Sequence, residues 1–244
     1  MIYAGPTVHT GNDLWVCHLG QVPYAEGVAI QDHARALRQA GEIPDTLLLL
    51  EHPPVYTYGR RAGADELPFP ESFYAARGIE VHATDRGGRV TYHGPGQLVG
   101  YPIMAVTDVI EHLRVMERAI AAALGELGIE ARGRVEDGPD YTGVWTGQRK
   151  IASLGVHISR GVSTHGFAVN VENDLEPFGW VVACGLPDVV MTSIAVETGG
   201  AGEGLRCFRK RMAHQFAVAH GRRQRLLSAH RIGIRAGDRE VVPA

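Results

Sequence analysis

Apolar residues recur at helical spacing most clearly between residues 109 and 127. The stripe advances by three or four residues, and its members are Val109, Leu113, Met116, Ile120, Leu124 and Leu127. Such a stripe is typical of an amphipathic helix with one face in the core. Asp108 stands before it and Glu111 follows three positions later, which is the spacing of a helix-capping box. Two further helices are predicted over Tyr24–Gln39 and over about 206–219.

Shorter apolar runs bounded by turn residues predict strands. The predicted strands cover Leu14–Leu19, Thr46–Glu51, Gln97–Ile103 and, approximately, 131–135, 143–146, 149–158 and 165–171. Residues 59–72 are rich in glycine, proline and charge, and they are predicted to be a loop. The strands cluster along the chain, and helices do not alternate with them regularly. This order predicts an α+β fold, with mixed sheets flanked by helices, rather than a doubly wound parallel sheet.

One charged residue lies on an otherwise apolar strand face. With a period of two, the residues that share this face are Lys150, Ala152, Leu154, Val156 and Ile158. The chain has 22 arginines and only two lysines, so a lysine here suggests a property that arginine lacks. A desolvated lysine can lose its proton, whereas arginine stays protonated. Lys150 is therefore a candidate base or nucleophile. The alternative, a strand-end lysine that reaches back to water, is the commoner case.

Length and composition exclude several classes of protein. The chain has 244 residues with 45% hydrophobic content, enough for one large domain or two small ones. A run of about 18 apolar residues is absent, so no transmembrane helix is expected, and the N-terminus lacks the pattern of a secretory signal. Cys17, Cys184 and Cys207 have no CxxC spacing, so neither a disulfide framework nor a zinc site is predicted. A reducing, cytoplasmic compartment is expected.

Charge is distributed unevenly along the chain. The net charge is −3, but the stretch Leu205–Arg235 holds eight arginines, one lysine and no acidic residue, while residues 1–204 have a net charge of −11. A basic region on an acidic body can dock an acidic partner. The simpler interpretation is a solvated helix face followed by a loose tail. Nucleic-acid binding is not expected, because the basic stretch has little aromatic interleaving.

The segment 86–97 is the richest in candidate ligand-binding groups. Paired glycines let the backbone approach a ligand, and arginine, threonine, tyrosine and histidine add side-chain donors around them. The segment matches neither a Walker loop nor the GxGxxG pattern. A glycine-rich hairpin would explain its glycines but not its variety of polar residues, so a ligand-binding loop is predicted.

Cys184 is the second candidate for chemistry. It ends an apolar run and precedes turn residues, where a thiol can face a pocket and a nearby cation would stabilise its thiolate. A cysteine that is simply packed in the core is the commoner alternative. The 12 histidines show no HExxH or similar spacing, so no metal site is predicted. No GxSxG motif occurs, which disfavours an α/β-hydrolase.

Five motifs occur in order between about residues 13 and 217. They are LEHPPVYT at 50–57, RGGRVTYHGPGQLVGYP at 86–102, GVWTGQRKIASLGVHISR at 143–160, THGFAVNV at 164–171 and ACGLPDVVMTSI at 183–194. Together they resemble the octanoyltransferases of lipoate assembly, the lipoate-protein ligase B family. Two positions depart from the family pattern: Ala183 stands where a proline is common, and Gly161 where a bulkier residue is usual.

The resemblance implies a single α+β catalytic domain over residues 1–220, like that of biotin and lipoate protein ligases, and a basic C-terminal tail over 221–244. It implies transfer of an octanoyl group from octanoyl-acyl carrier protein to a lysine of a lipoyl domain, through a cysteine thioester and without a cofactor or metal. The implied acceptors are the lipoyl domains of 2-oxoacid dehydrogenases and the glycine cleavage H protein. No nucleic-acid or membrane partner is implied.

The resemblance also implies the site residues. Cys184 falls on the family's acyl-thioester cysteine, and Lys150 on its paired lysine. The implied substrate-binding residues form three groups: Arg86, Gly87, Gly88, Arg89, Val90, Thr91, Tyr92 and His93; Ser153, Leu154 and Gly155; and Gly166, Phe167 and Ala168.

The chemistry of these residue types fits the implied mechanism. A lysine near Cys184 can take the thiol proton or stabilise the thiolate, and backbone N–H groups near Cys184 and Gly155 can hold the oxyanion. Two alternatives stay open. An ATP-dependent lipoate or biotin protein ligase on the same fold would need no cysteine nucleophile. A non-catalytic acyl-binding module would need neither Cys184 nor Lys150.

Overall fold

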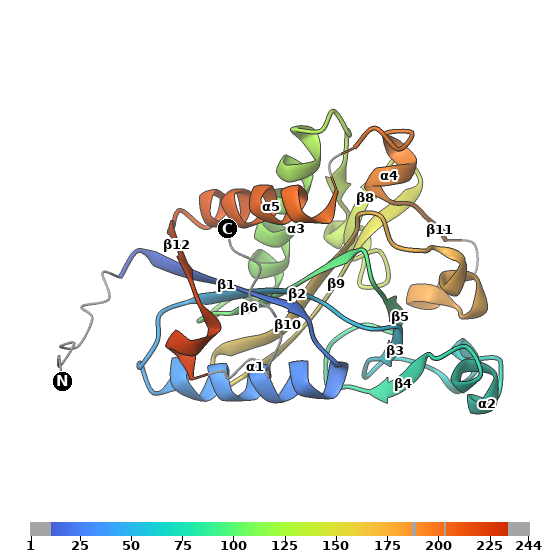
Figure 1. The fold of residues 1–244 in the computed structure, drawn as a ribbon, viewed down its shortest axis with the longest axis horizontal. Helices are drawn as coiled ribbons and strands as arrows, with labels where there is room; N and C mark the ends of the chain where they lie inside the picture. Colours follow the sequence, from blue (N-terminus) through green and yellow to red (C-terminus); the bar gives the residue numbers. More distant parts are fainter. Residues whose placement is uncertain (1–10, 187–188, 203, 234–244) are drawn as a thin grey trace.

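A large mixed sheet runs through the molecule (Figure 1). The computed structural model describes residues 11–186, 189–202 and 204–233, and for Ala64 and Cys184 it describes the backbone alone. The strands of this sheet are β1 (Asp13–Gln21), β2 (Thr46–Glu51), β6 (Gln97–Ile103), β7 (Arg132–Gly133), β8 (Gly143–Thr146), β9 (Arg149–Ser159), β10 (Val162–Asn170), β11 (Val190–Met191) and β12 (Arg223–Leu227). Their order is β12-β1-β2-β6-β10-β9-β8-β7, with β11 beside β9. β1 is parallel to β2 and β12, β11 is parallel to β9, and the other pairs are antiparallel.

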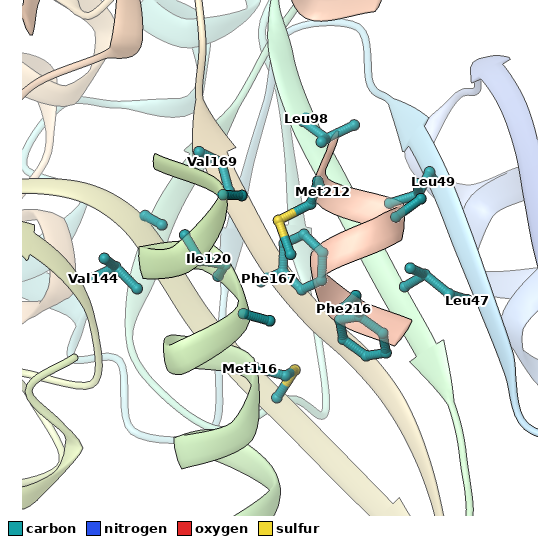
Figure 2. Packing of buried hydrophobic residues seen from close by; sticks show 14 of the residues in the cluster. Leu47, Leu49, Leu98, Met116, Ile120, Val144, Phe167, Val169, Met212 and Phe216 are labelled. Atoms are coloured by element: carbon teal, nitrogen blue, oxygen red, sulfur yellow. The ribbon is translucent and has the colours of Figure 1, made fainter. Parts of the chain in front are cut away.

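Helices cover both faces of the large sheet. Helix α1 (Tyr24–Gln39) packs on one face against β6 and β10. Helices α3 (Val109–Gly125) and α5 (Leu205–Ala219) pack together on the other face. Figure 2 shows the core between these two helices and the sheet, where Ile120 and Phe216 meet Phe167 of β10. The alternating apolar residues of the buried strands thus supply one core to each face.

The local sequence of α3 explains its start and its buried face. The Asp108 side chain accepts hydrogen bonds from the N–H groups of Ile110 and Glu111 at 2.9 and 3.0 Å, as the predicted N-cap requires. The predicted stripe is buried from Leu113 to Leu124. Val109 is exposed, because the first turn of the helix lies beyond the edge of the core.

A second, smaller sheet has the strand order β4-β3-β5. Its strands are β3 (Val55–Tyr58), β4 (Glu80–Ala83) and β5 (Val90–His93). With α2 (Glu71–Ala75), it encloses an aromatic cluster that includes Tyr56, Tyr74, Tyr92 and Phe178. Sequence patterns did not predict these strands, because they pair across long connections and one of them lies inside the glycine-rich segment. The predicted loop 59–72 also contains the short 3-10 helix η1 (Ala64–Glu66) and the start of α2.

The predicted α+β class with mixed sheets and flanking helices is confirmed. The bounds of α1, β2 and β6 agree with the sequence prediction, and α5 begins one residue earlier than expected. The strand expected over 131–135 is shorter, because β7 ends at Gly133 and the chain turns into the 3-10 helix η2 (Val135–Asp137). No helix in the described part of the chain is long and apolar enough to cross a membrane.

The predicted boundary at residue 220 does not separate the following residues from the large sheet. Strand β12 pairs with β1, and Arg223 and Arg225 both form ion pairs with the buried carboxylate of Asp13, at 2.7 and 2.6 Å. Arg222 pairs in the same way with Asp45, at 3.0 Å. These three arginines, which were expected in a loose tail, therefore form ion pairs that hold the edge strand β12 against the sheet. Residues 234–244 of the predicted tail lie outside the described residues.

Replacement of Phe216 tests whether α5 is part of the core. Phe216→Ala removes a fully buried ring next to Phe167 and should lower the free energy of unfolding by about 3–5 kcal/mol. Val218→Ala on the exposed face of the same helix should change it by less than about 0.5 kcal/mol. Urea denaturation followed by circular dichroism measures both, and equal losses would mean that α5 does not pack as described.

Candidate active site

The small sheet and the large sheet meet at two glycines. The N–H of Gly87, in the loop before β5, donates to the carbonyl of Val156 on β9 at 2.9 Å. The backbones approach so closely that a Cβ atom at position 155 would lie 2.6 Å from the oxygen of Gly87. Only a glycine at 155 permits this approach, which leaves a cavity between β5 and the strands β6, β9 and β10.

Most of the predicted site residues, the catalytic candidate Lys150 among them, line this cavity, although they come from separate motifs. They are Arg86, Gly88, Arg89, Val90, Thr91, His93, Lys150, Ser153, Leu154, Gly155, Gly166, Phe167 and Ala168. Gly87 and Tyr92 are not among the lining residues. Gly87 forms the junction just described, and Tyr92 packs in the aromatic cluster of the small sheet, with its ring 5.6 Å from that of Phe178. Tyr92 differs from Thr91 and His93 because successive side chains of a strand point to opposite faces.

Arg86 is buried and organises the loop that carries it. Its Nη2 donates to the carbonyl and the hydroxyl of Thr57 at 2.6 and 2.8 Å, and its Nη1 donates to the carbonyl of Gly87 at 3.0 Å. These bonds satisfy a charge that would be costly to bury alone. Arg86 therefore shapes the cavity wall through contacts within the protein.

Arg89 belongs to an ion-pair network at the rim. Its guanidinium donates to Glu66 at 2.7 Å and to Asp140 at 3.1 Å, and these two carboxylates raise the pKa of Arg89. Asp140 also accepts from Arg61 at 3.0 Å. The loop that holds Asp140 is thereby tied across the mouth of the cavity to the segment that precedes β5.

Two buried histidines are held neutral: His93, which lines the cavity, and His52, which is hydrogen-bonded to the lining residue Tyr101. The Nδ1–H of His52 donates to the carbonyl of Val22 at 2.6 Å, so its Nε2 accepts from the hydroxyl of Tyr101 at 2.7 Å. The Nδ1–H of His93 donates to the side-chain oxygen of Gln97 at 2.7 Å. Burial lowers the pKa of His52 to about 4 and that of His93 to about 3. Neither ring therefore carries a charge at neutral pH.

Several lining residues were not predicted from the sequence. They are Tyr24, Arg61, Val99, Tyr101, Pro139, Asp140, Thr142 and His165. His165 pairs with Asp85 at 2.8 Å, and its backbone has a φ of +57°, which is rare for a residue other than glycine. His165 lies in the motif THGFAVNV, and Tyr101 lies in RGGRVTYHGPGQLVGYP. Membership of these motifs was the sequence feature that could have identified both residues. Tyr24 and Asp140 reach the cavity only through the tertiary fold.

Lys150 is fully buried, with 1% of its surface exposed, so it does not reach back to water. On β9 it pairs with Trp145 of β8 and with Met191 of β11. Its Nζ lies 5.4 Å from the centroid of the Trp145 ring, within cation–π range. Its stem passes Gly143, where a Cβ atom would lie 2.6 Å from Lys150 Cε. Gly143 also has a φ of +146°, so position 143 has neither the space nor the conformation for a side chain.

The backbone of Cys184 lies in the short 3-10 helix η4 (Ala183–Gly185), which packs on β5. Gly185 lies against the side chain of Arg89. Further along the chain, the N–H of Thr192 donates to the carbonyl of Lys150 at 2.9 Å. The segment 185–192 therefore has one end at Arg89 and the other at Lys150, two residues of the same cavity.

The other two cysteines, Cys17 and Cys207, do not line the cavity. Cys17 is buried between the sheet and α1, and burial raises the pKa of its thiol to about 12. Cys207 is exposed on α5, a helix on the other side of the sheet from α1.

The N–H groups of Gly185 and Leu186 donate within the η4 turn, at 3.2 and 3.1 Å. Among the described residues, no group of three or more metal-ligating side chains comes together.

Comparison with known proteins identifies the class to which this fold and cavity belong. The lipoyl protein ligase A/B catalytic domain matches residues 23–217. A lipoate-protein ligase A with bound ATP superposes with a TM-score of 0.71 at 17% identity, over 90% of each chain. A bipartite lipoate protein ligase from Thermoplasma acidophilum superposes with a TM-score of 0.68 at 16% identity, over 90% of this chain and 88% of that one. At these identities the structures show the fold alone.

Relatives of similar sequence define the family within this class more narrowly. The octanoyltransferase of Acidothermus cellulolyticus is 50% identical over 190 residues, which is 75% of this chain and 81% of that protein. The octanoyltransferase of Solibacter usitatus is 48% identical over 73% of this chain and 81% of its own length. The chain therefore belongs to the octanoyltransferases of the lipoyl protein ligase A/B catalytic domain family, and it is an acyltransferase.

The neutral histidines make stability depend on pH. An unfolded histidine takes up a proton as pH falls through about 6.5, but folded His93 stays neutral down to about 3. The unfolded state then binds more protons, so the folded state loses stability as pH falls from about 6.5 towards 3. Each such histidine contributes a slope of about 1.4 kcal/mol per pH unit between pH 5 and pH 6.

His93→Gln should reduce this slope by about one proton. Urea denaturation at closely spaced pH values measures the slope. Phe178→Leu, a change in the neighbouring aromatic cluster that removes no titrating group, should lower stability without changing the slope. The same slope in wild type and His93→Gln would show that His93 is not held neutral in the folded state.

Proposed function

We propose that Cys184 is the nucleophile of octanoyl transfer and that Lys150 moves its proton. The observation that carries this proposal is the burial of Lys150 in the cavity, on a strand that pairs with the segment following Cys184. A buried amine can accept and return a proton, which the guanidinium of arginine cannot do. The position of Cys184 in the family motif supports its role as the thiol.

In the first half-reaction the Lys150 amine accepts the thiol proton of Cys184. The thiolate attacks the carbonyl carbon of the octanoyl thioester, and a new carbon–sulfur bond forms to Cys184. The bond to the donor's sulfur breaks, and that sulfur leaves as a thiol with the proton that Lys150 returns. No nucleotide is consumed, because one thioester replaces another.

In the second half-reaction the amine of an acceptor lysine attacks the octanoyl-Cys184 carbonyl. A free lysine is protonated at neutral pH and unreactive in that form, so a base at the site must remove a proton. We assign to Lys150 one of the two protons that the acceptor ammonium loses, and Lys150 returns this proton to the Cys184 thiol; the other proton passes to water. An amide forms, the thioester breaks, and the enzyme returns to its starting state.

We propose octanoyl-acyl carrier protein as the donor, and the lipoyl domains of 2-oxoacid dehydrogenases and the glycine cleavage H protein as acceptors. The relatives named octanoyltransferase support the acyl group, and family membership supports the two kinds of partner. A cytoplasmic location fits the free thiols of Cys17 and Cys207.

The main alternative is an ATP-dependent ligase. The fold does not distinguish the two, because a lipoate-protein ligase A bound with ATP shares it. The relatives at 43–50% identity favour octanoyl transfer. A non-catalytic acyl-binding module would leave the buried Lys150 and the family cysteine without a role.

Incubation with octanoyl-acyl carrier protein, without ATP, should add one octanoyl group to Cys184. Thioesters are cleaved by hydroxylamine, so the added mass should disappear on treatment with it. Intact-mass spectrometry and peptide mapping measure the label. Cys184→Ser should stay unlabelled or form only a slow, hydroxylamine-resistant ester, and Cys207→Ser should label like wild type. A label on Cys17 or Cys207, or a requirement for ATP, would contradict the proposal.

Lys150→Arg should be nearly as damaging as Lys150→Ala. Arginine keeps the positive charge but cannot give up its proton, and loss of a general base costs about 10²- to 10⁴-fold in rate. Single-turnover acylation of Cys184 across pH, for the wild type and both variants, gives the rates. A near-wild-type rate for the arginine variant would leave Lys150 only as an electrostatic partner of the thiolate.

A further inference from the structure

Glu117 places a buried carboxylate on the face of α3 that packs in the core. Met116 and Ile120 of the same helix belong to the core, and only 4% of Glu117 is exposed. Burial raises the pKa of Glu117, while three backbone N–H groups and Lys150 act in the opposite direction. A carboxylate held in the core needs such partners, because its desolvation is costly.

This one carboxylate holds both ends of the loop 134–143. Its Oε1 accepts from the N–H of Gly143 at 2.9 Å and from the N–H of Arg134 at 3.2 Å, and its Oε2 accepts from the N–H of Val135 at 3.3 Å. Between these anchored ends the loop contributes Pro139, Asp140 and Thr142 to the cavity wall. The base of the loop is thus fixed from inside the core, and Asp140 ties its outer part to the rim arginines.

Gly143 connects this anchor to Lys150. Strand β8 begins at Gly143, which pairs with Ser153, and Trp145 two residues later pairs with Lys150. The Lys150 stem lies directly against Gly143, within 2.6 Å of the place where a Cβ atom would be. A shift of Gly143 would therefore move the surface on which the lysine rests.

We propose that Glu117 is a positioning residue for Lys150. It fixes Gly143 and the loop 134–143 so that the Lys150 amine is held at one place in the cavity, and it supplies a negative charge near that amine. Misplacement of a catalytic group by about 1 Å can cost about 10²-fold in rate. This inference rests on the proposed role of Lys150 in proton transfer.

Several other charged groups of α3 and of the elements packed against it form ion pairs of their own. Arg134 pairs with Asp137, and its guanidinium lies 4.3 Å from the ring centroid of Tyr141. Arg114 of α3 pairs with Glu136 of η2 on the surface. None of these pairs includes Glu117 or Lys150.

The test compares Glu117→Gln, Glu117→Ala and the control Glu111→Gln, an exposed position of the same helix. Single-turnover acylation of Cys184 by octanoyl-acyl carrier protein is measured across pH, together with amide hydrogen exchange of residues 134–143. Glu117→Ala should acylate about 10- to 100-fold more slowly and exchange faster in the loop. Glu117→Gln keeps an acceptor for Gly143, so it should recover most of the rate. Its acidic limb should move to lower pH, because the ammonium form of Lys150 has lost a negative neighbour.

Three results decide the question. Wild-type rate, pH profile and loop exchange in Glu117→Gln would overturn the inference, even if Glu117→Ala does not fold. Glu117→Gln added to Lys150→Ala should cause no further loss, and an additive loss would overturn it too, because the effect would not pass through Lys150. If Lys150→Ala alone keeps the wild-type rate, the proposed proton transfer fails instead, and the inference falls with it.

Discussion

The shape of the cavity depends on a close backbone contact, the hydrogen bond from the N–H of Gly87 to the carbonyl of Val156. It joins the loop before β5 to the middle of β9, and with it the small sheet to the large one. A hydrogen bond of this kind contributes only about 1 kcal/mol by itself. Its effect is geometric, because the two backbones meet where residue 155 has no side chain. Thr91 and His93 then face the residues of β9 and β10 across one cavity.

Several polar groups in and around the cavity wall are bonded within the protein before any ligand arrives. Arg86 is bonded to Thr57, Arg89 is paired with Glu66, and His52 and His93 are neutral and hydrogen-bonded. Groups fixed in this way need no reorganisation when a ligand binds, and interactions between charges are stronger in a site of low dielectric constant than in water. The resulting wall is polar and oriented, and its His93 ring is uncharged at neutral pH.

The reaction proposed for this site requires few catalytic groups besides one that transfers a proton. A thioester is already activated, so exchange requires a thiolate and a group that takes and returns one proton. Lys150 can do this only if its amine is held in place inside the protein. Helix α3 contributes to that end through Glu117, while its neighbours Met116 and Ile120 form the core. One helix therefore stabilises the fold and supports the candidate site.

The sequence by itself determined the elements and residues that depend on near neighbours. Periodicity defined α1, α3 and β6, Asp108 marked the start of α3, and ordered motifs identified the family and most of the cavity wall. The tertiary structure alone decided which face of β5 meets the cavity, that β12 joins the large sheet, and that Glu117 anchors Gly143. These features depend on contacts between residues far apart in the chain. Local patterns do not encode such contacts, because the partners meet only once the two sheets have packed.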